Sequence, residues 1–298
     1  MTGEIPAQRR PPRPPEPGTL RGAPPPARAA QAPAAGSAQV RVIPGKNAET
    51  AQIELQGQTK YVIQWETDAA VEMARGEFAR ALSIFDMILQ AFPHYAKAWY
   101  NRGVILHQGM RDFEGALYAY NKAHAALPQN TDILHNKAKL LSEMKREKEA
   151  AVTYEQVIRI DPKYVKSLEG LGALYINSGQ PEAAEKYLDR AVTLYEKSGQ
   201  DPYRALQLLA TAYTNAGKSK EAIKALDKAL NKHPQDDTLW EAKGIALSNM
   251  DKYREAVQCF TECLRLNRSN RFASETRQQL LEVCKERKIR FSDAELAY

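Results

Sequence analysis

The order of hydrophobic and polar residues changes near residue 61. Beyond that point, apolar residues recur at i, i+4 and i+7, as Ala81, Phe85 and Ile88 do, with polar residues between them. Residues with this spacing lie on one face of an α-helix. The pattern therefore predicts a succession of amphipathic helices from about residue 62 to residue 290.

The helical stretches also repeat one another. One helix of each unit carries a small residue four positions before a large one, and these small residues are Ala81, Ala116, Ala150, Ala184, Ala222 and Ala256. The helix before it begins with a large apolar residue, namely Trp65, Trp99, Leu134, Leu168, Leu206 or Trp240. A small residue lets two helices approach closely, and the large one fills the groove beside it. The repeat predicts pairs of packed helices.

A unit of about 34 residues with this order of Trp or Leu, Gly or Ala, Ala, an aromatic or Leu, and a closing Pro resembles the tetratricopeptide repeat (TPR). The resemblance implies an all-α fold, a right-handed α-solenoid of about six helix–turn–helix repeats. We place them at residues 62–95, 96–130, 131–164, 165–198, 203–236 and 237–270. The second unit has one extra residue near Gly109, and the fourth lacks the closing proline, which predicts a lengthened helix.

The segments outside the repeats differ in composition. Residues 1–39 hold ten of the 17 prolines and few large apolar residues, so we expect a disordered tail. Residues 40–61 show brief alternation of apolar residues, which predicts a linker or a short hairpin. Residues 271–298 begin as an amphipathic helix. We expect it to cap the array, because a last repeat needs a polar outer face.

The resemblance also implies a binding site. In TPR proteins the first helix of each unit lines a concave groove, and certain positions point inward. The candidate groove residues at those positions are Lys97, Tyr100, His107, His135, Lys139, Lys166, Asn177, Arg204, Gln207, Asn215 and Asn249. The four basic ones predict a stripe that attracts a partner with acidic segments. The alternatives are solvated charges, and asparagines that belong to ordinary helix-end turns.

Charge and composition argue against nucleic-acid binding, a membrane span and a disulfide framework. The formal net charge is +6, and most of the surplus precedes residue 62, so the repeats are nearly neutral and a nucleic-acid-binding surface is not expected. No apolar run reaches the 18 residues of a membrane span, and no apolar signal region follows the N-terminal arginines. Three cysteines are too few for a disulfide framework, which favours a reducing, cytoplasmic location.

Motifs of catalysis are missing from the sequence. It contains no phosphate-binding glycine loop, no nucleophile elbow and no zinc-binding His-Glu-x-x-His. We therefore expect no enzyme activity, no cofactor and no metal. The sequence predicts a protein-interaction scaffold that binds a peptide or helix of a partner. The alternative is a regulatory or targeting subunit of an enzyme carried on another chain, and self-association through repeat ends remains open.

Overall fold

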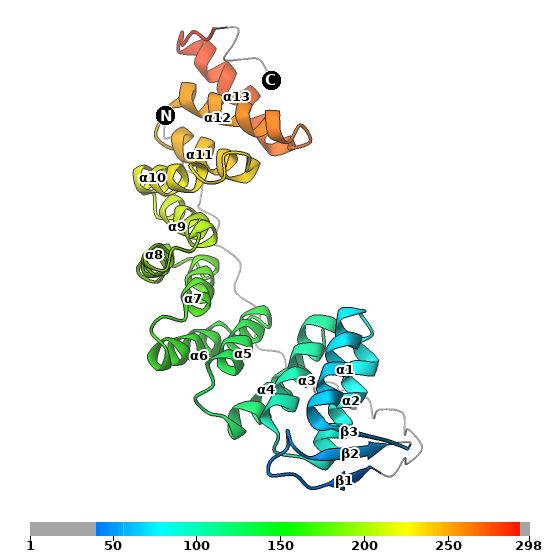
Figure 1. Cartoon of the computed structure of the whole chain (residues 1–298). Helices are drawn as coiled ribbons and strands as arrows, with labels where there is room; N and C mark the ends of the chain where they lie inside the picture. Colours follow the sequence, from blue (N-terminus) through cyan, green and yellow to red (C-terminus); the bar gives the residue numbers. More distant parts are fainter. Residues whose placement is uncertain (1–39, 56, 293–298) are drawn as a thin grey trace, which may run out of the picture. The chain divides into compact units, whose positions relative to one another are not determined.

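The computed structural model describes residues 40–55 and 57–292 of the chain (Figure 1). The tail expected to be disordered, residues 1–39, lies outside this part, and so do residues 293–298 of the predicted C-terminal tail. The described residues form thirteen α-helices, one π-helix and three short strands.

Two helices fall within each of the six units placed from the sequence. The pairs, in chain order, are α1 (Val62–Ala74) and α2 (Phe78–Ala91), α3 (Ala96–Val104) and α4 (Phe113–Ala126), α5 (Thr131–Glu143) and α6 (Glu147–Ile160), α7 (Val165–Asn177) and α8 (Pro181–Lys197), α9 (Tyr203–Asn215) and α10 (Ser219–Leu230), and α11 (Asp237–Ser248) and α12 (Tyr253–Leu266). Each helix packs on the next one along the chain (Figure 1). The fold is a solenoid of helical repeats.

The small residues of the repeat lie where paired helices touch. Gly103 of α3 lies against Tyr120 of α4, and Gly172 of α7 lies against Leu188 of α8. A Cβ atom added to either glycine would lie only 2.6 Å from the large side chain opposite. Leu188 and Tyr120 are fully buried. The pairs are thus held by large side chains that fill the space left by glycine.

The second and fourth units depart from the regular pair of helices. Each departure lies at the position where the sequence of that unit departs from the repeat. In the second unit, α3 continues into a π-helix, η1 (Ile105–Gly109), next to the position of the extra residue. A π-turn takes up one more residue than an α-turn does, so it accommodates this insertion. In the fourth unit, α8 extends over 17 residues, and Gly199 follows it with φ of 69°. The lengthened helix predicted from the missing proline is present.

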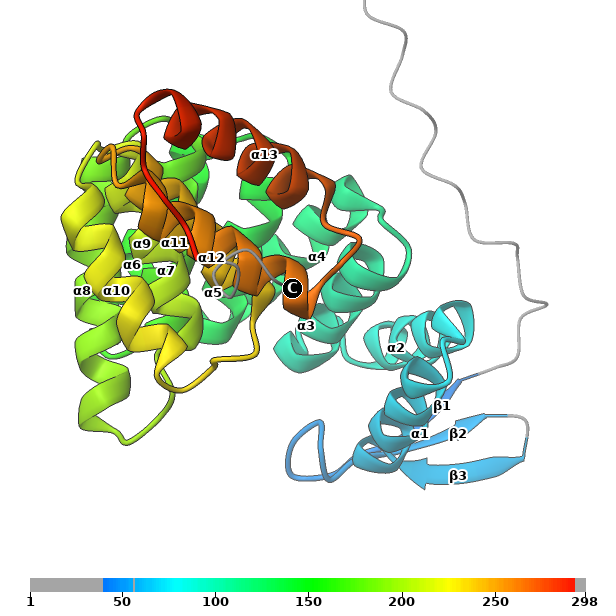
Figure 2. The ribbon, with the colours of Figure 1, turned by 90° about the horizontal axis from the view of Figure 1, so that it is seen from above.

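The segment before the first unit forms a sheet of three strands instead of a linker or a hairpin of two. Strands β1 (Arg41–Ile43), β2 (Gln52–Leu55) and β3 (Gln58–Tyr61) pair antiparallel in that order. Figure 2 shows the sheet beside α1. Ile53 is fully buried, and the indole Nε1 of Trp65 donates a hydrogen bond of 3.3 Å to its carbonyl oxygen. The sheet therefore covers the first helix of the array.

We expect Ile53→Val to lower the free energy of unfolding by about 1 kcal/mol, because a methylene is lost from a buried position in the core. The matched control is Ile43→Val on β1, whose side chain is 38% exposed and should tolerate the change. Urea denaturation followed by circular dichroism measures both variants. Equal losses would show that the sheet does not pack on the repeats.

The opposite end of the described array is a single helix, α13 (Arg271–Glu286), which packs on α12. The side chain of Asn270 accepts a hydrogen bond of 2.9 Å from the amide of Ala273 and so caps its first turn. Leu280 and Cys284 are buried on one side of the helix, while Lys285 is exposed on the other. This distribution is the one expected of a terminal element with one covered face.

Candidate functional site

The residue at the fifth position of each first helix bonds to the following repeat or to the cap. We call the side of the first helices that carries these residues the first-helix face. Its fifth-position residues are Glu66, Tyr100, His135, Glu169, Gln207 and Glu241. Their partners are, in the same order, Lys97, Asn136, Ser167, Arg204, Thr238 and Asn270.

Two of these contacts are ion pairs that hold basic residues of the predicted stripe. The carboxylate of Glu66 lies 2.7 Å from Nζ of Lys97 and also accepts a hydrogen bond of 2.9 Å from the hydroxyl of Tyr95. The carboxylate of Glu169 lies 3.8 Å from Nε of Arg204. Both glutamates are buried, and burial raises the pKa of Glu169 while Arg204 opposes the rise. Lys97 and Arg204 therefore compensate buried negative charges of the chain itself.

The third unit places aromatic and polar side chains around His135. Its Nδ1 lies 2.9 Å from the hydroxyl oxygen of Ser167, and its ring packs 5.7 Å from Tyr154 and 5.4 Å from Tyr164. The hydroxyl of Tyr164 donates a hydrogen bond of 2.5 Å to Asp132. These contacts join α5 to the start of α7 and fix the ring of His135 between them.

Lys139 and Lys166 stand close enough to His135 to change its titration. Burial, then the charges of Lys166 and Lys139, lower the pKa of His135 to about 4. Both lysines are exposed, and neither forms an ion pair with any residue in the described part of the chain. They are thus the two members of the predicted stripe that form no ion pair within that part, although the charge of Lys166 also acts on the buried carboxylate of Glu169.

His107 corrects one prediction, because it is buried and does not line an open groove. It belongs to the π-helix η1, is only 1% exposed, and packs against the rings of Phe113 and Tyr120. Its Nε2 lies 3.2 Å from a carboxylate oxygen of Glu143. Burial lowers its pKa, and Glu143 works in the opposite direction. Through this contact the buried ring of His107 joins η1 to α5.

The remaining candidates are polar and lie on the first-helix face or at its ends. Tyr100 accepts a hydrogen bond of 2.9 Å from Asn136, and Gln207 donates one of 3.3 Å to Thr238. The three asparagines lie at the C-terminal ends of first helices and are exposed; they are Asn177, Asn215 and Asn249. Gly179 and Gly217, with φ of 70° and 74°, follow two of them, so helix-end turn geometry accounts for their positions.

Glu66, Glu169 and Glu241 are the fifth-position residues of this face that were missing from the candidate set. For Glu66 and Glu169 the signal that could have found them is in the sequence, because each precedes a basic residue at the second position of the next unit. Such a pair lies about one repeat apart, and neighbouring repeats contact each other. Among residues 40–55 and 57–292, no three His, Cys, Asp or Glu side chains gather as metal ligands.

Comparison with known proteins agrees with the repeat pattern. Family models described as tetratricopeptide repeat match residues 69–131, 107–170, 165–235 and 238–270. No curated protein matches the chain. None of the helices in the described part of the chain combines the length and apolar character needed to cross a membrane.

Solved structures share the fold at low sequence identity. The chain is 22% identical to MamA protein, with a TM-score of 0.53 over 58% of this chain and 92% of that one. It is 18% identical to YrrB, described as a TPR protein with an unusual peptide-binding site, with a TM-score of 0.56 over 65% and 97%. PilF of Pseudomonas aeruginosa gives 18% identity and a TM-score of 0.60 over 73% and 97%. Repeat pattern, helix pairs and family matches together make this chain a member of the tetratricopeptide repeat family.

Proposed function

We propose that this protein is an interaction scaffold whose first-helix face binds a peptide or helix of a partner that carries carboxylates. The observation that carries the proposal is the pair Lys139 and Lys166, which are exposed on adjacent units and form no ion pair among the described residues. Two such charges attract a negative segment and orient it along the array. YrrB, with the same fold, is described as having a peptide-binding site, which supports this class of function.

The residues around the two lysines indicate which kind of partner segment would fit there. The charges of both lysines act on His135, which is neutral at pH 7 because its pKa is lowered to about 4. It therefore adds no positive charge of its own. Tyr164, whose partly exposed ring lies 5.4 Å from that of His135, offers aromatic surface beside it. A segment with a carboxylate next to an aromatic or apolar residue fits this chemistry.

Peptide selection tests the proposal with a library in place of a single partner. A displayed library of random peptides is selected on the full chain, and we expect the bound peptides to be enriched in Asp and Glu. The affinity of a selected peptide should fall about tenfold or more for Lys139→Glu/Lys166→Glu, because two attractive charges become repulsive. Fluorescence anisotropy at two salt concentrations measures affinity and salt dependence.

The matched control carries the same change of charge on second helices. It is Lys148→Glu/Lys186→Glu, whose lysines are exposed on α6 and α8 of the same two units. We expect its affinity to stay within about threefold of the original protein. Circular dichroism establishes that each variant is folded. Equal affinity and equal salt dependence for both double variants would rule out the two lysines as the binding surface.

A further inference from the structure

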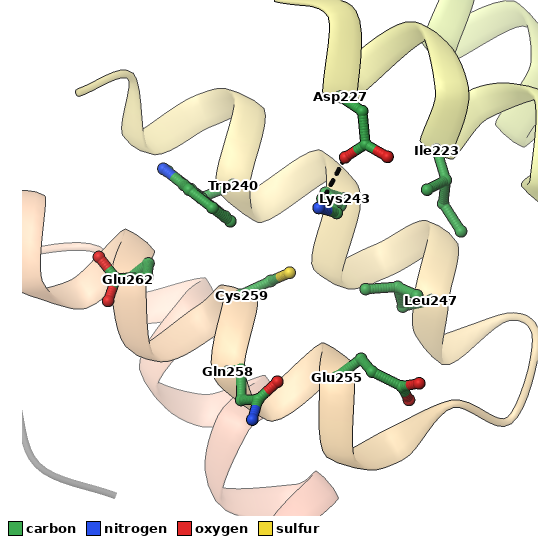
Figure 3. Close-up of a pocket in the computed structure, with 9 residues that line it drawn as sticks. All are labelled: Ile223, Asp227, Trp240, Lys243, Leu247, Glu255, Gln258, Cys259 and Glu262. Carbon is green, nitrogen blue, oxygen red and sulfur yellow. Dashed lines mark ion pairs between the residues drawn. The ribbon is translucent and has the colours of Figure 1, made fainter. Parts of the chain in front are cut away.

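A hollow of about 450 Å³ opens between α10, α11 and α12, away from the first-helix face. Trp240 and Lys243 of α11 line one wall, and α12 forms the other (Figure 3). Lys243 comes two residues after Glu241, which corresponds to about 200° round an α-helix. The hollow and the first-helix face are thus on opposite sides of α11, and the two surfaces can act independently.

The second unit contains the same arrangement around its own tryptophan. Nε1 of Trp99 donates to the carbonyl of Pro93 at 2.7 Å, and Nε1 of Trp240 donates to that of Pro234 at 2.9 Å. The residue three positions after each tryptophan is basic and lies over the indole ring, at 5.7 Å for Arg102 and 5.4 Å for Lys243.

The ion pairs of these basic residues also match. Arg102 pairs with Asp86 at 2.7 Å, and Lys243 pairs with Asp227 at 2.6 Å. Both aspartates belong to the preceding second helix, α2 or α10. The side chains around Trp240 in the sixth unit can therefore be compared, residue by residue, with those around Trp99 in the second.

The difference lies in what covers the indole. In the second unit, Tyr118 of α4 packs its ring 5.7 Å from that of Trp99, edge to face, and Lys122 lies 5.4 Å from the ring of Tyr118. Counted from the starts of α4 and α12, the matching residues of the sixth unit are Gln258 and Glu262. An aromatic ring and a cation are thus replaced by an amide and a carboxylate, and the space beside Trp240 forms the hollow.

The charges around the hollow favour a positive occupant. Asp227, Glu255 and Glu262 line it together with Lys243, so acidic side chains outnumber basic ones. Glu255 and Glu262 also pair with Lys252, which precedes α12, and with Arg265 of α12, at 3.9 Å and 2.8 Å; these exposed pairs hold the two carboxylates weakly.

The negative charge also affects the pKa of a buried thiol in the same wall. Burial raises the pKa of Cys259 to about 11; Lys243 opposes this rise, and the carboxylates of Asp227, Glu255 and Glu262 add to it. All three carboxylates therefore act on the same small volume. The thiol remains protonated at neutral pH and takes no part as a nucleophile.

We propose that this hollow is a second docking site, which receives an arginine side chain of a partner protein. A guanidinium is planar and always charged, so it can stack on the exposed part of Trp240 and bond to the carboxylates of Glu255 and Glu262. It supplies both the flat group and the cation that Tyr118 and Lys122 supply in the second unit. The site thus fits a basic segment, whereas the first-helix face fits an acidic one.

Nuclear magnetic resonance of the full chain tests the proposal at the residue concerned. The three tryptophans give three indole N–H signals, and Trp240→Phe identifies one of them. The probe is the blocked peptide acetyl-Ala-Ala-Arg-Ala-Ala-amide. We expect it to shift the Trp240 signal saturably, with a Kd on the order of millimolar, as a single side-chain contact provides. The same peptide with citrulline, a neutral analogue of arginine, should produce no saturable shift.

Two variants separate the site from general charge effects. Glu255→Gln/Glu262→Gln should weaken binding about tenfold, because both charge-assisted hydrogen bonds are lost. The matched control is Glu182→Gln/Glu221→Gln, whose carboxylates are exposed on α8 and α10, and it should bind as the original protein does. Gln258→Tyr introduces the residue that covers Trp99 and should abolish the shift by filling the hollow.

Three results would overturn the proposal. The first is a Trp240 signal that does not move at millimolar concentrations of the arginine peptide. The second is equal binding of the citrulline peptide, since charge would then play no part. The third is equal or tighter binding of a peptide with phenylalanine in place of arginine, which would make the hollow a site for apolar side chains.

Discussion

Ala184→Leu is expected to lower the free energy of unfolding by about 3 kcal/mol, because it forces a large side chain between two helices in contact. Ala184 lies on α8, is fully buried, and precedes the fully buried Leu188 by one helical turn. Leu188 already fills the space beside Gly172 of α7, where a single added Cβ would come within 2.6 Å of it. An isobutyl group at this fully buried position would be forced against its neighbours, so we expect α7 and α8 to separate.

Urea denaturation measures this loss, with Ala125→Leu as the matched control. Ala125 lies on α4, where its side chain is exposed, so the same substitution there should change the free energy of unfolding by less than about 0.5 kcal/mol. An unchanged denaturation midpoint for Ala184→Leu would contradict the close packing of α7 and α8.

The repeats could be predicted from the sequence because their packing residues are close together along the chain. A small residue and a large one four positions apart define a helix face, and recurrence at one period defines the unit. The π-helix at Ile105–Gly109 was visible only as an extra residue near Gly109. Strand β3 had no such signal, because Gln58–Tyr61 is mostly polar and its pairing partner is β2.

The first-helix face was harder to predict, because its properties depend on contacts between repeats. Lys97 and Arg204 are basic, as Lys139 and Lys166 are, yet only the first two form ion pairs with buried glutamates. His107 follows the family's inward register, but the π-turn lies at that position and the ring is buried. Periodicity gives the face to which a residue belongs, whereas pairing and burial depend on the neighbouring unit.

The pH dependence of stability is expected to reflect His135. Its pKa is about 4 in the folded chain, below the value of about 6.5 for an unfolded histidine. At pH 7 the ring is neutral in both states. As the pH falls from about 6.5 to 4, the unfolded chain binds a proton that the folded chain does not, so stability falls. A shift of this size corresponds to a loss of up to about 3 kcal/mol.

Denaturation of the original protein and of His135→Gln at pH 7, 6 and 5 measures this contribution. Carboxylates titrate in both proteins and largely cancel in the comparison, so the variant should lose less stability between pH 7 and pH 5. Parallel losses in the two proteins would show that His135 is not the group responsible.

Lys166→Glu tests whether the charge of the lysine acts on that histidine. Replacing a nearby positive charge by a negative one favours the protonated ring, so the pKa of His135 should rise. The imidazole signals of His135, followed by nuclear magnetic resonance as the pH is lowered, give the midpoint directly. Lys186→Glu makes the same change of charge on the second helix α8 and should move the midpoint less. An equal midpoint in the original protein and in Lys166→Glu would place Lys166 too far from His135 for the two lysines to bind one partner segment together.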